Sequence, residues 1–190
     1  MKFRALMFGL VLAALAVGQA SAQKFDLGVE AGANFSNFIG SDVSNLSNAP
    51  ASKLGFVGGA FLCLNIGNVF GIRPELLYEQ KGAAISGTST SEELDYIEVP
   101  VLLKFSLGLP VVNPALLLGP SFSWNTVATD VNGKTIPDIN SSDVGIVGGL
   151  ELDIDKFLLS GRYELGLQNI RSNSKVQNGT ITLLVGYSFI

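Results

Sequence analysis

The sequence of 190 residues contains no histidine and only one cysteine, Cys63. Histidine is the commonest general base and metal ligand, so a Ser-His-Asp triad and a Cys-His pair are both excluded. A single cysteine also excludes a small secreted module held together by internal disulfides. Cys63 lies between Leu62 and Leu64, and we expect its thiol to be buried and inert. The residue types predict no enzymatic activity, no catalytic residues, no cofactor and no metal site.

Long hydrophobic runs are also missing after the first 22 residues. The mean hydropathy is nevertheless +0.41, although no later segment reaches the roughly 18 consecutive apolar residues of a spanning helix. A chain this apolar has either a very large soluble core or strands that turn one face to lipid.

The first 22 residues have the three parts of a secretory signal peptide. Lys2 and Arg4 give a positive start, residues 6–17 are apolar, and residues 20–22 form a small-residue cleavage site. We therefore expect residues 1–22 to be a cleaved signal peptide and 23–190 to be one mature domain; an uncleaved membrane anchor is the alternative. Cleavage leaves ten basic residues against 16 acidic ones, a balance that disfavours nucleic-acid binding.

Apolar residues recur at every second position through most of the mature part, which is typical of strands with one apolar face. Phe25, Leu27 and Val29, for example, alternate with Asp26 and Glu30. Alternation is clean in five segments, near 25–35, 72–79, 97–105, 157–165 and 181–189. It is less regular in three more, near 53–66, 114–125 and 143–155. The pattern predicts about eight strands, each near the 9–11 residues that cross a bilayer at a tilt.

The connections between these segments alternate in length. Long or medium polar connections at 36–52, 82–92, 126–142 and 169–177 alternate with short ones at 66–68, 107–113 and 155–156. Long outer loops and short periplasmic turns are typical of membrane barrels. We therefore predict an all-β fold, a single closed up-and-down antiparallel transmembrane β-barrel with both termini at the periplasmic end.

The polar faces of the strands carry charges of both signs. In a membrane barrel the apolar face points to lipid and the polar face lines the lumen. An eight-stranded barrel is only wide enough for side chains to fill, so these charges are expected to pair in a structural network rather than line a conducting pore. The predicted lumen network consists of Glu30, Arg73, Glu75, Glu79, Lys81, Glu98, Lys104, Glu151, Arg162 and Glu164.

Aromatic residues lie on the apolar faces, many near strand ends, where a membrane barrel carries aromatic girdles. They are Phe25, Phe35, Tyr78, Phe105, Trp124, Tyr163, Tyr187 and Phe189. The third long connection gathers oxygen-bearing residues that could bind calcium, but they lack the spacing of a known calcium loop, and a solvated polar loop is the favoured interpretation. These residues are Asp130, Asn132, Asp138, Asn140 and Asp143.

Two strings lie in these strands, RPELLYEQKG at 73–82 and LDYIEVPVLLK at 94–104. With shorter matches at 119–120, 145–149, 162–163, 166–167 and 186–189, they resemble the PorT-type outer-membrane β-barrel family, related in architecture to the small OmpX and OmpA barrels. The sequence departs from the family in ending on Ile190 rather than on an aromatic residue. The resemblance implies a location and a fold but no single biochemical activity.

Three functions remain open at this point. The first is a structural or interaction barrel, a monomer in outer-membrane lipid that meets a protein partner through its outer loops. The second is a narrow channel or small-solute transporter. The third is a soluble secreted lipid binder of lipocalin type, because an eight-stranded cup can hold one small ligand.

Cell fractionation separates the membrane interpretations from the soluble one. We expect the protein in the outer-membrane fraction and, before heating, faster migration on a detergent gel, because a closed barrel keeps its backbone groups paired and stays compact. Recovery from the periplasm without detergent would contradict the membrane assignment.

Overall fold

The computed structural model describes residues 23–40, 50–85, 91–129, 142–169 and 176–190. These residues form eight strands. They are β1 (Gln23–Ile39), β2 (Pro50–Ile66), β3 (Phe70–Ile85), β4 (Ser91–Ser106), β5 (Val112–Thr129), β6 (Ser142–Ile154), β7 (Phe157–Gly166) and β8 (Gln177–Ser188). No helix long and apolar enough to span a membrane occurs in this described part of the chain. The expected signal peptide, residues 1–22, lies outside it.

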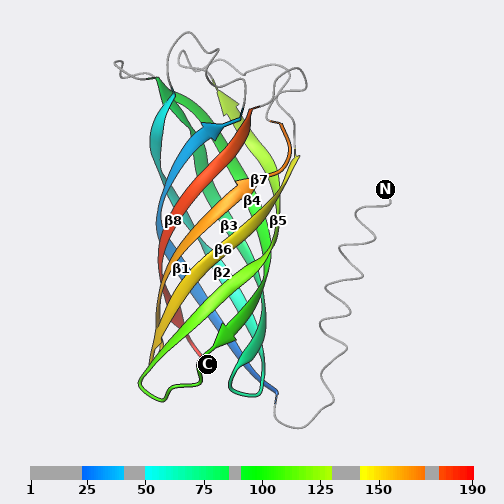
Figure 1. Ribbon diagram of the computed structural model, residues 1–190. Helices are drawn as coiled ribbons and strands as arrows, with labels where there is room; N and C mark the ends of the chain where they lie inside the picture. The colour runs from blue at the N-terminus through cyan, green and yellow to red at the C-terminus, as the bar shows by residue number, and fades with distance from the viewer. Residues whose placement is uncertain (1–22, 41–49, 86–90, 130–141, 170–175) are drawn as a thin grey trace.

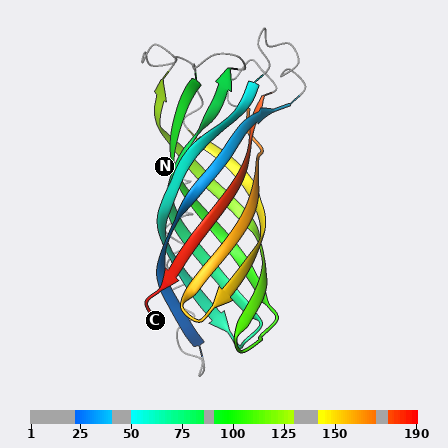
Figure 2. The ribbon, with the colours of Figure 1, turned by 90° about the vertical axis from the view of Figure 1, so that its left-hand side faces the viewer.

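The strands form one closed antiparallel barrel in which each strand pairs with its neighbour in sequence. Closure comes from β1 and β8, which pair from Gly28↔Ser188 to Ile39↔Gln177. Figures 1 and 2 show the strands strongly tilted, with the short turns and the C-terminus at one end and, at the other, the strand ends that precede and follow the longer connections. Closure removes the unpaired strand edges that lipid could not satisfy, and the predicted fold class is confirmed.

The side chains are arranged as a membrane barrel requires. On β8, Thr182 and Leu184 are buried in the lumen, whereas Leu183 and Val185 are more than half exposed on the outer wall. Apolar side chains are exposed on all eight strands. A soluble lipocalin-type barrel would have the opposite arrangement, with its apolar face inside, so the outer wall argues against that alternative.

The predicted strand length of 9–11 residues was too short. Seven strands are longer, from 12 residues in β8 to 18 in β5. At the end with the long connections, hairpin pairing continues through polar and small residues, for example Ala84↔Ser91 between β3 and β4. Antiparallel pairing satisfies backbone groups in water as well as in lipid, so strands need not end at the hydrocarbon boundary.

The short connections agree with the sequence. The β6–β7 hairpin turns through Asp155 and Lys156, and Asp155 adopts a positive φ of 54°, a conformation that Asp and Asn tolerate better than most residues. The β2–β3 turn spans residues 67–69, and residues 107–111 join β4 to β5. The end that carries these three turns is the periplasmic end in barrels of this kind.

Glycine allows neighbouring strands to approach closely at Gly119 of β5. A Cβ atom there would lie 2.1 Å from the backbone oxygen of Val101, which is well inside contact distance. Gly148, on the facing strand β6, has only Leu118 Cδ1 nearby, at 3.8 Å. The two glycines belong to one strand pair but differ in the space around them.

This difference predicts opposite outcomes for two alanine substitutions. Gly119→Ala should lower the free energy of unfolding by about 1–3 kcal/mol, because the added methyl group overpacks the lumen wall. Gly148→Ala should be neutral or slightly stabilising, because alanine has less backbone entropy to lose than glycine. Urea unfolding in phospholipid vesicles measures both, and equal effects would contradict the close-approach explanation.

Candidate functional site

All ten charged residues of the predicted network lie inside the barrel. Each is buried, with at most 8% of the residue exposed. The structure divides them into two groups. The Arg73 group, nearer the short turns, contains Arg73, Glu30, Glu75, Lys104, Glu151 and Arg162, together with Asp153. The Lys81 group, nearer the long connections, contains Lys81, Glu79, Glu98 and Glu164.

Arg73, which is fully buried, is the centre of the first group. Its guanidinium contacts Glu30 at 2.6 Å, Glu75 at 2.8 Å and Glu151 at 2.5 Å, and its Cζ lies 4.0 Å from the centre of the Phe61 ring. These contacts join β1, β2, β3 and β6 across the lumen. Charge-assisted hydrogen bonds to several carboxylates replace the hydration that the guanidinium loses on burial.

Arg162 on β7 shares all three of these carboxylates. It lies 2.6 Å from Glu75, 3.1 Å from Glu30 and 4.0 Å from Glu151. Lys104 on β4 extends the group towards the short turns, with Nζ 2.9 Å from Glu151 and 2.7 Å from Asp153. Three cations therefore meet four carboxylates in one continuous network.

The Lys81 group has a different charge balance. The Lys81 ammonium contacts Glu79 at 3.0 Å, Glu98 at 2.6 Å and also Glu164. Ser121 and Ser123 on β5 donate hydrogen bonds to Glu164 and Glu98, at 2.9 and 3.0 Å. One cation is therefore paired with three carboxylates.

The three carboxylates of the Lys81 group have the composition of a metal site. Oxygens of Glu79, Glu98 and Glu164 lie within 4.8 Å of one another. The Lys81 ammonium contacts all three residues, so it already occupies the position that a cation would take. The arrangement is that of an ion-paired cluster.

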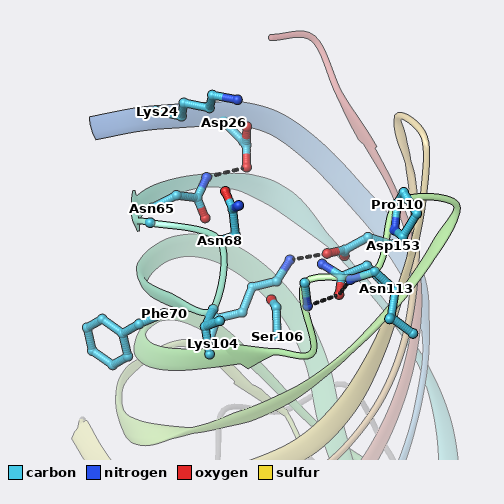
Figure 3. Close-up of a pocket in the computed structure, with 14 residues that line it drawn as sticks. Lys24, Asp26, Asn65, Asn68, Phe70, Lys104, Ser106, Pro110, Asn113 and Asp153 are labelled. Carbon is cyan, nitrogen blue, oxygen red and sulfur yellow. Dashed lines mark hydrogen bonds and ion pairs between the residues drawn. The ribbon is translucent and has the colours of Figure 1, made fainter. Parts of the chain in front are cut away.

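A polar vestibule opens at the periplasmic end of the lumen (Figure 3). It consists of two adjacent pockets of about 440 and 250 Å³, which share Asp26, Lys104 and Asp153 as lining residues. Asn65 donates a hydrogen bond to Asp26 at 2.7 Å, and Lys104 contacts Asp153, as the dashed lines in Figure 3 show. The smaller pocket is also lined by Arg73, which is itself fully buried, so water that enters from this end reaches Lys104 and Asp153 at the edge of the Arg73 group.

Sequence reasoning missed several of the network's partners. Asp153 follows Glu151 on the lumen face of β6 and could have been found by extending the period-two pattern. Ser121 and Ser123 continue the lumen row of β5 from Leu117, but nothing in the sequence shows that they contact carboxylates. Cys63 is buried on the lumen side, where its thiol donates to Asn65 at 3.3 Å.

The structure describes all eight of the predicted outer-wall aromatic residues but only one of the five possible calcium ligands. Seven of the eight aromatic residues expected on the outer wall are 37–52% exposed there, and Tyr78 is partly exposed. Of the proposed calcium ligands, four fall in residues 130–141, outside the described residues. Asp143 is described, and it accepts hydrogen bonds from the backbone of Val144 and Gln168.

Removing the central cation tests the Arg73 group. Arg73→Met should lower the free energy of unfolding by about 3–5 kcal/mol, because it leaves buried carboxylates without their partner. Lys156→Met, on the exposed β6–β7 turn, is the control and should change it by less than about 0.5 kcal/mol. Urea titrations in vesicles measure both, and a small effect at Arg73 would show that the network contributes little.

The charge excess of the Lys81 group predicts an asymmetry. Lys81→Met should destabilise the barrel by about 3–5 kcal/mol because three buried acids lose the cation that contacts all of them. Glu79→Gln should be neutral or stabilising, since it removes one of the excess negative charges and keeps the shape of the side chain. Urea titrations in vesicles measure the free energy of unfolding of both variants. An equally large decrease for Glu79→Gln and Lys81→Met would contradict the predicted asymmetry.

The comparisons with known proteins agree with this geometry. The family model described as "Outer membrane protein beta-barrel domain" matches residues 19–172. The chain is similar to Ail, the attachment invasion locus protein of Yersinia pestis, solved with the heparin analogue sucrose octasulfate (16% identity, TM-score 0.53, 87% of this chain and 99% of that one). It is also similar to Neisserial surface protein A, NspA (17% identity, TM-score 0.56, 86% and 97%). No curated protein matches the chain. The chain belongs to the outer membrane protein beta-barrel domain family, and it is a small OmpX/OmpA-like barrel of the bacterial outer membrane.

Proposed function

We propose that the protein is a scaffold that presents its outer connections to a protein partner, and that its lumen does not conduct. The observation that carries the proposal is the Arg73 group. Contacts of Arg73 and Arg162 with Glu30, Glu75 and Glu151 cross the lumen between β1, β3, β6 and β7. An ion-paired plug of this kind is a poor pathway for solutes, because opening it would leave buried charges without their partners.

The composition of the outer connections supports a partner recognised by hydrogen bonds. Residues 41–49, 86–90, 130–141 and 170–175 are rich in Ser, Asn and Thr. They contain three acidic and three basic residues, namely Asp42, Asp130, Asp138, Lys134, Arg171 and Lys175. The sulfated ligand of Ail makes a polyanion worth considering, but equal numbers of acids and bases give these connections no positive field to attract one.

The remaining parts of the proposal concern the chain as a whole. We infer that residues 1–22 are removed on export and that 23–190 form the mature barrel, because residues 1–22 have the three parts of a signal peptide. The strings at 73–82 and 94–104 support placing the chain among PorT-type barrels. Exposed apolar side chains around the whole wall support a monomer in lipid, and the lack of histidine supports a role without catalysis.

Planar-bilayer recording tests the closed lumen. The wild-type protein should give no discrete conductance steps. Arg73→Ser combined with Glu151→Ser should produce steps or unstable currents, because it removes the groups that bridge β3 and β6. Regular steps from the wild-type protein would favour the channel alternative.

Photo-cross-linking in intact cells tests the partner. A cross-linking residue at Thr88 or Asn132, in the outer connections, should give a discrete protein adduct. The same residue at Leu150, on the lipid-facing wall, is the control and should give none. Absence of adducts from the outer positions at normal expression would contradict an interaction role.

A further inference from the structure

Two of the three periplasmic turns expose apolar side chains. Ile66, at the end of β2, and Leu107 and Val111, between β4 and β5, are 47–73% exposed. We call these three residues the apolar foot. Val69 and Leu109 are also exposed, but they line the polar vestibule. Neither segment, 65–72 or 105–112, contains a charged residue, a tyrosine or a tryptophan.

The two turns form one structural unit. The backbone N–H of Ser106 donates to the carbonyl of Val69 at 2.7 Å, and the rings of Phe70 and Phe105 pack edge to face with their centres 5.2 Å apart. Asn113 Oδ1 accepts hydrogen bonds from the backbone N–H of Gly108 and Leu109, at 2.8 and 3.2 Å. The apolar side chains are therefore held on a fixed backbone.

The third turn, between β6 and β7, ends differently, although it follows the β4–β5 turn around the barrel and Val112 pairs with Ile154. Asp155 and Lys156 are exposed there, directly beside Tyr187, whose ring packs on Phe157 and Phe189 with ring centres 5.3 and 5.8 Å away. In both Figure 1 and Figure 2 this turn lies closer to the middle of the barrel than the β2–β3 and β4–β5 turns do. Charges and a tyrosine are typical of the membrane–water boundary, so the boundary on the β7–β8 side lies at this turn.

The segments around the β2–β3 and β4–β5 turns contain no charge, tyrosine or tryptophan that would mark such a boundary. Ile66 continues the lipid-facing row of β2, and Leu107 continues the row of Leu103 and Phe105 on β4. Phenylalanine has no polar atom that needs water, so the Phe70–Phe105 pair can lie within hydrocarbon. Exposed apolar area that is continuous with a lipid-facing surface is stabilised by the same solvent.

We propose that lipid of the periplasmic leaflet covers the apolar foot. The hydrocarbon boundary then reaches the turn tips on the β2–β5 side but stops at Tyr187 on the β7–β8 side. The barrel is consequently tilted in the membrane, or the leaflet is deformed around it. This inference concerns the end opposite the outer connections and does not depend on the proposed scaffold role.

Environment-sensitive fluorescence at single positions tests the proposal. Cys63→Ala removes the only thiol, and an NBD label is then placed at Leu107→Cys or Ile66→Cys in the full barrel refolded into phospholipid vesicles. Leu150→Cys, on the lipid-facing wall, is the buried-in-lipid control, and Lys156→Cys is the aqueous control. Heat-modifiable migration confirms that each variant has folded, and two foot positions guard against the failure of one.

The proposal expects the labels at positions 107 and 66 to resemble the label at 150, with blue-shifted emission, quenching by nitroxide-labelled lipids and loss of quenching by iodide. Emission and iodide quenching equal to those at position 156 would overturn it. Protection from iodide without quenching by the nitroxide lipids would also overturn it, in favour of contact between copies of the chain. Protection only in native outer membranes, and not in lipid vesicles, would point to a protein partner instead.

Discussion

The structure depends on the pairing of charges inside a barrel whose described interior buries more polar and charged side chains than apolar ones. The apolar side chains of each strand face lipid, so the polar and charged side chains of the opposite face must lie in the lumen. For Arg73, Arg162 and Lys81 this is possible because each buried cation contacts two or more carboxylates. Among the described residues, the interior also contains small apolar clusters, one of Val57, Leu77 and Leu184 and one of Leu102, Leu117 and Val147. The ion pairs lie in the same lumen as these clusters and connect strands across it.

The closed sheet and the ion pairs support each other. Closure fixes the positions of all eight strands, so the carboxylates of β1, β3 and β6 meet one guanidinium without loop rearrangement. The ion pairs in turn connect strands that are not neighbours in the sheet, such as β1 with β3 and β3 with β7. Backbone pairing alone joins each strand only to its two neighbours, so the network adds cross-barrel connections that the sheet lacks.

The two ends of the barrel differ in chemistry. At one end, long connections rich in Ser and Asn leave the barrel, and they suit recognition of another molecule. At the other end, short turns surround a polar vestibule that leads to Arg73, and two of these turns carry the apolar foot. The plug between the ends separates them, which is why we treat the outer connections and the periplasmic turns as independent surfaces.

The sequence by itself determined the strand count, the order of long and short connections and which residues face the lumen. All three depend on local patterns, because a period of two assigns Glu30 or Lys104 to a face whatever the neighbouring strands do. It did not determine how far each strand runs beyond the membrane, because hairpin pairing in water leaves no hydrophobic signal. Nor could it divide ten charges into one group around Arg73 and another around Lys81, or reveal the two serines of β5 as partners. Those contacts join residues up to 132 positions apart, and only the register and closure of the sheet decide which side chains share a level of the lumen.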